Sequence, residues 1–121
     1  MLENFVRILS LTGRYNDPNY IYLTDKEKKD LEFIDSCIYS DNENINNTSF
    51  YLMMLVLEIA NDPDSFIPEV IQERENTIIN NLTDEEKVTM KKFFTACINS
   101  LGVLNEENIN QRKLEKKGMN K

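Results

Sequence analysis

Residues 50–60 read Phe-Tyr-Leu-Met-Met-Leu-Val-Leu-Glu-Ile-Ala, and Glu58 is the one charged residue among them. Apolar residues lie on nearly every side of this segment when it is drawn as a helix, which is typical of a helix surrounded by others. We therefore expect a central helix at about 49–60, capped by one of the polar residues at 47–49. Pro63 follows and ends it, because the residue before a proline disfavours the helical conformation.

Apolar residues at helical spacing predict further helices on both sides of this segment. They are expected over 2–12, from Thr24, from about Pro68, from Thr83 and over 105–117. The Asn-rich stretch 40–49 predicts a loop. Residues 20–23 (Tyr-Ile-Tyr-Leu) are β-prone, and we expect a short strand or an extended segment there.

The predicted fold class is therefore all-α. We expect a compact bundle of five to six helices around the central helix, with one short extended segment at 20–23. Residues 1–104 would form a single helical domain, and residues 105–121 a polar, basic C-terminal helix or tail. Oligomeric state is left open.

Two of the expected helices begin with nearly the same six residues. Residues 23–28 read Leu-Thr-Asp-Lys-Glu-Lys, and residues 82–87 read Leu-Thr-Asp-Glu-Glu-Lys. Each contains a capping box, in which the threonine hydroxyl and the glutamate three residues later satisfy each other's backbone amides. We interpret the likeness as convergence on a good helix start; a duplicated half is the alternative.

Composition excludes several kinds of chemistry. The chain has no His, two Cys and three Gly, so it lacks the residues for imidazole catalysis, a four-thiolate zinc site or a glycine-rich phosphate loop. Cys37 and Cys97 lie on or beside apolar stripes and are expected to be buried. We predict no enzyme activity, no catalytic residues, no cofactor and no metal site. A hydrolase that uses paired carboxylates remains an alternative.

Charge is distributed unevenly along the chain. The net charge is -7, yet five of the fourteen basic residues lie in the last eleven positions. Residues 62–86 hold eight acids against one base, Arg74. Such a surface repels phosphate backbones and attracts a basic protein, although acidity also serves solubility. We expect no nucleic-acid partner and a basic protein partner instead. The residues predicted to bind it are Asp62, Asp64, Glu69, Glu73 and Glu75.

Neither a membrane segment nor a secretory signal is expected. Arg7 interrupts the first apolar run, and the longest unbroken apolar run has eight residues, against about 20 needed to cross a bilayer. The predicted location is the cytoplasm.

Residues 49–71 (SFYLMMLVLEIANDPDSFIPEVI) and 80–94 (NNLTDEEKVTMKKFF) resemble a pattern in small uncharacterised bacterial helical proteins. In these families an apolar helix led by Phe/Tyr-Leu precedes a variable acidic or proline-containing middle. Leu-Thr-x-Glu-Glu/Gln-Lys then opens a last helix that ends in Phe-Phe or Phe-Leu. Some are encoded beside secreted toxins and act as immunity proteins. Here Met53 follows Leu52, where those families often have proline.

The predicted function is a small acidic binding protein, and the resemblance implies that it neutralises a toxin by occlusion. The alternative is a helical oligomerisation or regulatory module of a phage, virus or mobile element. Salt dependence separates the two, because salt weakens a charge-steered interface and leaves an apolar one unaffected.

Overall fold

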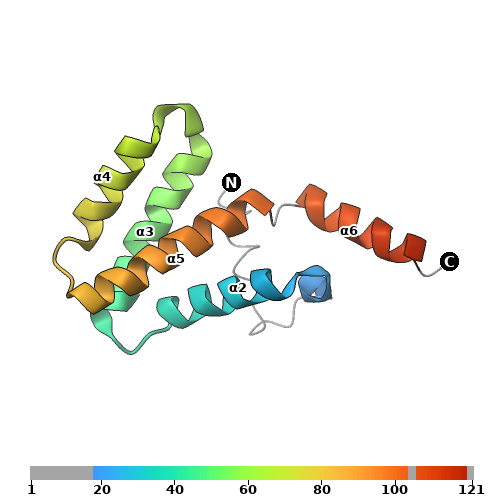
Figure 1. The fold of residues 1–121 in the computed structure, drawn as a ribbon, viewed down its shortest axis with the longest axis horizontal. Helices are drawn as coiled ribbons and strands as arrows, with labels where there is room; N and C mark the ends of the chain where they lie inside the picture. The colour runs from blue at the N-terminus through green and yellow to red at the C-terminus, as the bar shows by residue number, and fades with distance from the viewer. Residues whose placement is uncertain (1–17, 104–105, 120–121) are drawn as a thin grey trace.

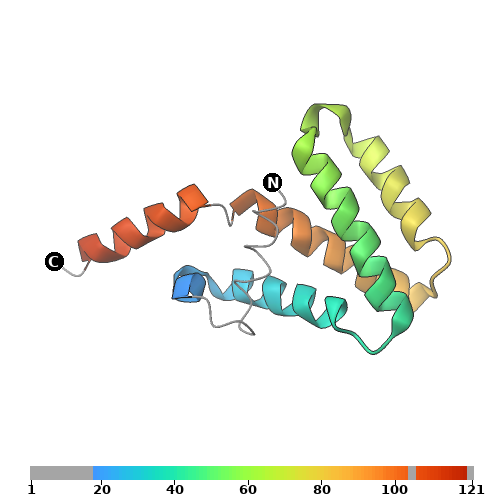
Figure 2. The same ribbon diagram turned by 180° about the vertical axis from the view of Figure 1, so that it is seen from behind.

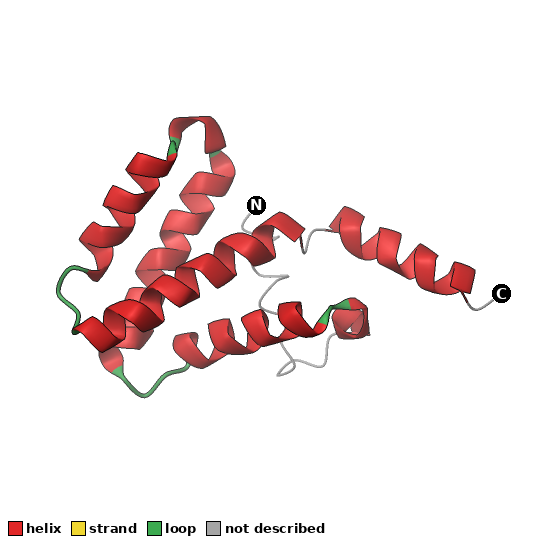
Figure 3. Cartoon of the chain, in the orientation of Figure 1, coloured by secondary structure: helices red, strands yellow, loops and turns green. Residues whose placement is uncertain are grey.

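The computed structural model describes residues 18–103 and 106–119, and every regular element in these ranges is helical (Figures 1 and 3). The predicted all-α fold is confirmed, whereas the helix predicted at 2–12 lies outside the described residues. The elements are η2 (Pro18–Tyr22), α2 (Asp25–Ile38), α3 (Glu43–Asn61), η3 (Pro63–Ser65), α4 (Pro68–Ile79), α5 (Asp84–Val103) and α6 (Glu106–Met119).

The helices form two pairs. Figure 1 shows α2 and α5 side by side and antiparallel, whereas α3 and α4 form a hairpin joined through η3. Seen from behind in Figure 2, α3 crosses in front of α5, and it contacts α2, α4 and α5. The central position predicted for this helix is confirmed. The last helix, α6, extends away from the bundle beside η2.

The core lies where α2, α3 and α5 meet. Phe93 and Met90 of α5 are fully buried, as are Leu31 and Ile34 of α2, so the apolar stripes predicted for these helices face the core. From α3 the core receives Leu52, Leu55 and Val56. Burial of this apolar surface is the main stabilising contribution to the fold.

The start of α3 differs from the prediction. The helix begins at Glu43, so the loop expected at 40–49 is helical over most of its length. Asn42 caps it, since its Oδ1 accepts from the amides of Asn44 (2.9 Å) and Ile45 (3.3 Å). Asn46 donates through Nδ2 to the carbonyl of Ile38 at the end of α2. Asparagine is a weak helix former in isolation, but here these side chains satisfy the ends of two helices.

Both predicted capping boxes are present. The amide of Thr24 donates to Glu27 (2.8 Å), whose own amide donates to the Thr24 hydroxyl (3.2 Å). Thr83 and Glu86 make the same pair of bonds at 3.0 and 3.2 Å. Each box therefore satisfies two of the amides that a helix start leaves without partners.

Each glutamate also has a second, long-range role. Arg112 of α6 donates to both carboxylate oxygens of Glu27, at 2.6 and 2.8 Å. Glu86 instead accepts from the side-chain amides of Asn42 (3.0 Å) and Asn44 (3.3 Å). The first box thus fixes α6 to α2, and the second joins the starts of α3 and α5.

The segment before α2 is a 3-10 helix, so the strand or extended segment predicted at 20–23 is wrong. Four β-prone residues without a neighbouring strand cannot satisfy their backbone groups in an extended form. Here the Leu23 amide donates to the carbonyl of Tyr20 (3.1 Å), and Arg112 donates to the carbonyl of Tyr22 (3.0 Å). Leu23 itself is buried in the core.

The basic C-terminal segment is helical and is attached to the bundle. Ile109 of α6 is fully buried, and the ammonium groups of Lys113 and Lys116 lie 5.7 and 5.4 Å from the centre of the Tyr22 ring. Together with Arg112 these contacts hold α6 against η2. Within the described ranges, none of the helices has the length and apolar character needed to cross a bilayer.

Candidate functional site

The outer side of α3 carries large apolar residues that the fold does not cover. Tyr51 is 62% exposed, Met54 60% and Phe50 48%, although Leu55 next to them is 1% exposed. Met54 lies three positions after Tyr51 and four after Phe50, so all three residues lie on one side of the helix. They are named the α3 strip below. The expectation that α3 is surrounded on all sides is therefore wrong, since this side faces outward.

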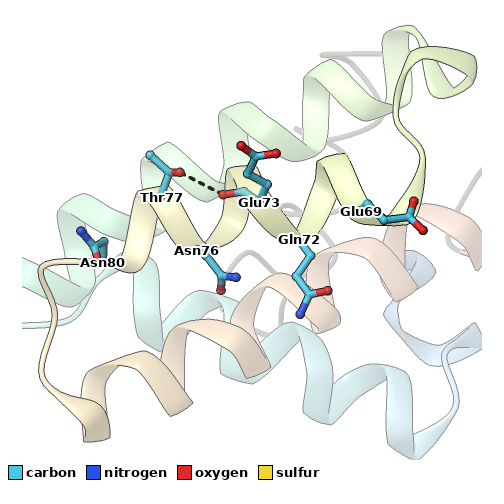
Figure 4. A pocket seen from close by; sticks show the side chains of 6 residues that line it. All are labelled: Glu69, Gln72, Glu73, Asn76, Thr77 and Asn80. Carbon is cyan, nitrogen blue, oxygen red and sulfur yellow. Dashed lines mark hydrogen bonds between the residues drawn. The ribbon is translucent and has the colours of Figure 1, made fainter.

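The outer face of α4 is polar and acidic. Figure 4 shows six residues that line a hollow of about 580 Å³ along it. They are Glu69, Gln72, Glu73, Asn76, Thr77 and Asn80. All six belong to α4 or directly follow it, so the hollow has no second wall and is an open surface. The carboxylates of Glu69 and Glu73 point in different directions, which limits the repulsion expected from their spacing.

The α3 strip and the acidic face of α4 adjoin. A hollow of about 190 Å³ between the two helices is lined by Tyr51 and Met54 on one side and by Thr77 and Ile78 on the other. Thr77 also lines the acidic face, and its hydroxyl donates to the carbonyl of Glu73 (2.9 Å). The α3–α4 hairpin therefore presents an apolar strip and an acidic face on one continuous surface, named the hairpin face below.

The one base within residues 62–86 does not neutralise the acidic face. Arg74 donates to Glu58 of α3 at 2.8 Å, and both side chains are about half exposed. An exposed pair of this kind contributes little stability, about 0–1 kcal/mol. Because Arg74 pairs with Glu58 across the hairpin, it does not pair with the acids of the outer face. Among the described residues, the carboxylates of Glu69 and Glu73 have no cationic partner.

The five residues predicted to bind a partner do not all lie together. Glu69 and Glu73 are exposed on the outer face of α4. Asp62 and Asp64 are exposed at the turn between α3 and α4, where Asp62 accepts from the Ser65 hydroxyl (2.6 Å). These four residues occupy the hairpin and the turn that closes it.

Glu75 occupies a different environment. Its side chain is partly buried, and burial raises its pKa, an effect that the nearby Lys91 of α5 opposes. It therefore faces the α5 side of α4 rather than the outer face. The four other predicted residues are better placed than Glu75 to meet a partner that approaches the hairpin.

The described residues offer little for catalysis or metal binding. No group of three or more Cys, Asp or Glu that could hold a metal ion occurs within residues 18–103 and 106–119. Cys37 and Cys97 are both buried with free thiols, as predicted. Burial raises the pKa of both thiols, which disfavours the thiolate that nucleophilic chemistry needs.

Sequence reasoning missed the apolar half of this surface. Tyr51 and Met54 were assigned to the core because the whole segment 50–57 is apolar. A signal was nevertheless present: Asn47, Glu58 and Asn61 fall on the same side of the helix as Tyr51 and Met54. A helix that carries polar residues at both ends of one side exposes that side.

Comparisons of this chain with protein-family models, with curated proteins and with solved structures found no match.

Proposed function

We propose that this chain is a non-enzymatic, cytoplasmic protein that binds a basic protein partner through the hairpin face. The single observation that carries the proposal is the contact between two unlike surfaces: the exposed α3 strip and the unpaired carboxylates of α4. Protein interfaces combine these features, with aromatic residues and Met at the centre and polar or charged residues at the rim.

The two halves of the face would act at different stages of binding. Carboxylates without cationic partners attract a positively charged surface over several ångströms and so raise the association rate. Tyr51 and Met54 would then be buried in the complex and slow dissociation, because large apolar side chains contribute most of the energy at the centre of an interface. The net charge of -7 adds a general attraction for a basic partner.

The resemblance to immunity-type proteins supports a specific form of this proposal, in which the partner is a toxin blocked by steric occlusion. A small rigid bundle with a charged face is suited to that task, since it covers a site without needing chemistry of its own. The alternative, an oligomerisation module, is favoured by the same apolar strip, which a second copy of the chain could cover.

The experiment compares four versions of the immobilised chain as bait for proteins from the source cell. They are the wild type, Glu69→Lys with Glu73→Lys, Tyr51→Ala with Met54→Ala, and a control in which Glu32→Lys and Asp41→Lys change the net charge equally elsewhere. Glu32 and Asp41 are exposed and lie outside the hairpin face.

We expect one basic protein to be retained by the wild type and the control and lost by both hairpin variants. Loss from both charge-changing variants, with retention by Tyr51→Ala with Met54→Ala, would show that only net charge matters. Retention by all of them would show that the hairpin face is not the binding surface. Sedimentation of the chain alone tests the alternative: a dimer that Tyr51→Ala with Met54→Ala dissociates would favour oligomerisation.

A further inference from the structure

The hairpin face contains a hollow that both of its helices line. This hollow lies between α3 and α4 and has a volume of about 190 Å³. Its lining is Tyr51, Met54, Leu55 and Glu58 of α3, with Arg74, Thr77 and Ile78 of α4. Because the hollow has two walls, a side chain that entered it would lose more contact with water than one that lay on the open surface of α4.

The lining of this hollow is mainly apolar. Tyr51 and Met54 are more than half exposed, so each has apolar surface that a ligand can still cover. Leu55 and Ile78 also contribute to the lining, although the first belongs to the core and the second packs against it. Removing apolar surface from water favours binding in proportion to the area removed, so the hollow favours an apolar side chain over a charged one.

The volume of the hollow limits what can enter it. An apolar cavity of about 150 Å³ in another protein accommodates one benzene molecule. The hollow between α3 and α4 is of similar size, so it has room for one large apolar side chain, such as Phe, and not for a whole helix. The remainder of a partner would lie outside the hollow, on the surface of α4 beside it.

The surface beside the hollow is acidic. Thr77 lines both the hollow and the outer face of α4, where Glu73 lies one turn before it and Glu69 two turns before it (Figure 4). The linings of the hollow and of this outer face together contain three acids and one base, and the base, Arg74, pairs with Glu58 at 2.8 Å. The two remaining acids give the surface beside the hollow a negative charge, which attracts cations.

The positions of these two acids define a spacing along α4. Residues four positions apart in a helix are separated by about 6 Å along its axis. Glu73 and Glu69 are therefore about 6 and 12 Å along α4 from Thr77 at the hollow. A second helix that lay along α4 would match this spacing if it carried basic residues four and eight positions from its apolar residue.

We propose that the hairpin face binds a basic helix of its partner, which inserts one large apolar side chain into the hollow between α3 and α4. The basic residues of that helix would pair with Glu69 and Glu73. Insertion of side chains from a helix into a hydrophobic groove is a common mode of peptide recognition. This inference rests on the function proposed for the hairpin face, and it adds the chemistry of the segment that binds there.

Three fluorescein-labelled helical peptides of about 18 residues serve as probes. The first carries one central Phe and has Lys four and eight positions away on both sides of it. In the second, Ala replaces the Phe. The third has the composition of the first, with the Lys residues moved to the side of the helix opposite the Phe. Each peptide is titrated with the full chain, and fluorescence anisotropy reports binding.

Two variants separate the hollow from the acidic surface. Met54→Ala removes part of one wall, and its matched control, Val88→Ala, removes a similarly exposed apolar side chain from α5, outside the hairpin face. Glu69→Lys with Glu73→Lys reverses the charge beside the hollow, and its control is the charge control of the bait experiment. Urea midpoints establish that all four variants are folded.

We expect the wild type to bind the Phe peptide about tenfold more tightly than the Ala peptide, because only the first buries a ring in the hollow. Met54→Ala should reduce this preference, and Val88→Ala should leave it unchanged. The third peptide should bind more weakly than the first. The proposal would be overturned by failure of the Phe peptide to bind, by equal binding of the Phe peptide and either other peptide, or by equal effects of the two Ala variants.

The charge variant distinguishes failure of this inference from failure of the proposed function. If Glu69→Lys with Glu73→Lys weakens the binding of both the Phe and the Ala peptide more than its control does, and the wild type shows no preference for Phe, the hairpin face binds basic segments without the insertion proposed here. If the charge variant and its control bind the peptides equally, the function proposed for the hairpin face is contradicted as well.

Discussion

The two sides of α3 are nearly equal in apolar character, but one side is buried and the other is exposed. Leu52, Leu55 and Val56 on one side are buried in the core, and substituting them would open cavities there. Tyr51 and Met54 on the other side are more than half exposed and touch a partly polar hollow beside α4. Within residues 50–57 the sequence does not separate these two sides, and only the polar Asn47, Glu58 and Asn61 beyond that segment mark the exposed one.

This difference shows that α3 has more apolar surface than the core buries. Exposed apolar residues scattered singly are common and need no explanation. Here they form a continuous strip, and the helix beside it carries unpaired acids. This apolar strip, which adds nothing to the core and adjoins a charged face, supports the binding proposed for the hairpin face.

The largest effect is expected from a pair of neighbouring substitutions on α3. Leu55→Ala should lower the free energy of unfolding by about 2–5 kcal/mol, because it removes buried apolar surface and leaves a cavity. Met54→Ala should change it by less than about 0.5 kcal/mol, as expected of a surface site. Urea unfolding of the two variants measures the contrast. Similar losses at both positions would mean that the strip is packed and unavailable to a partner.

The buried side of α3 depends on α2 and α5, whose starts are fixed by the two capping boxes. Thr24→Ala and Thr83→Ala should each cost about 1 kcal/mol, because each leaves helix amides without an acceptor. The two losses should add, since the boxes make no shared hydrogen bond. Neither variant should change partner binding at the hairpin face. A loss of binding that exceeded the loss of folded protein would show that the two sides of α3 are coupled.

The first capping box should make the stability of the fold depend on pH, and capping is only part of the cause. The hydrogen bonds from Arg112 lower the pKa of Glu27 below its ordinary value, so the folded state binds the proton less tightly than the unfolded state. The ion pair therefore stabilises the fold at neutral pH, by about 1–2 kcal/mol, and this is lost as the pH falls below the ordinary carboxyl pKa of about 4.

The variant Glu27→Gln keeps the capping geometry and removes the charge. Its urea midpoint should lie below that of the wild type at about pH 7, and the difference should be smaller at about pH 3. Glu86→Gln is the matched control at the second box, where the long-range partners are uncharged amides. A gap of the same size at both pH values for Glu27→Gln would contradict the charge pairing with Arg112.

The smallest effect on stability is expected at the acidic face itself. Glu69→Lys with Glu73→Lys should change the free energy of unfolding by less than about 0.5 kcal/mol, since both side chains are exposed on α4. Urea unfolding checks this before any binding experiment. A large loss would mean that these carboxylates support the fold, and binding defects of the variant could then not be assigned to the interface.

Much of the fold could be predicted from local pattern. The apolar spacing of α2, α4 and α5 and the two Leu-Thr-Asp starts were sufficient, because caps and stripes act within one or two turns of a helix. The start of α3 was missed although its cap is local, since Asn42 accepts from the amides of Asn44 and Ile45. The tertiary contacts that support this start could not be predicted from local pattern: Asn42 donates to Glu86, and Asn46 donates to the carbonyl of Ile38.

Of the candidate site, only the acidic charge was predicted from the sequence. The acids of α4 stand out in composition. All five predicted residues lie on α4 or the turn before it, and four of them are exposed. The exposure of Tyr51 and Met54 depends on where α4 lies against α3, which an all-apolar segment does not reveal.

The most direct test of the hairpin face is the association rate of the captured basic partner at two salt concentrations. For the wild type we expect fast association at low salt and a clear decrease at high salt, because exposed charges steer the encounter and salt screens them. The Glu69→Lys, Glu73→Lys variant should associate slowly at both concentrations, while the Glu32→Lys, Asp41→Lys control keeps most of the salt dependence. Equal association rates for the wild type and the hairpin variant at low salt would contradict the account and reduce the acidic face to a contribution to solubility.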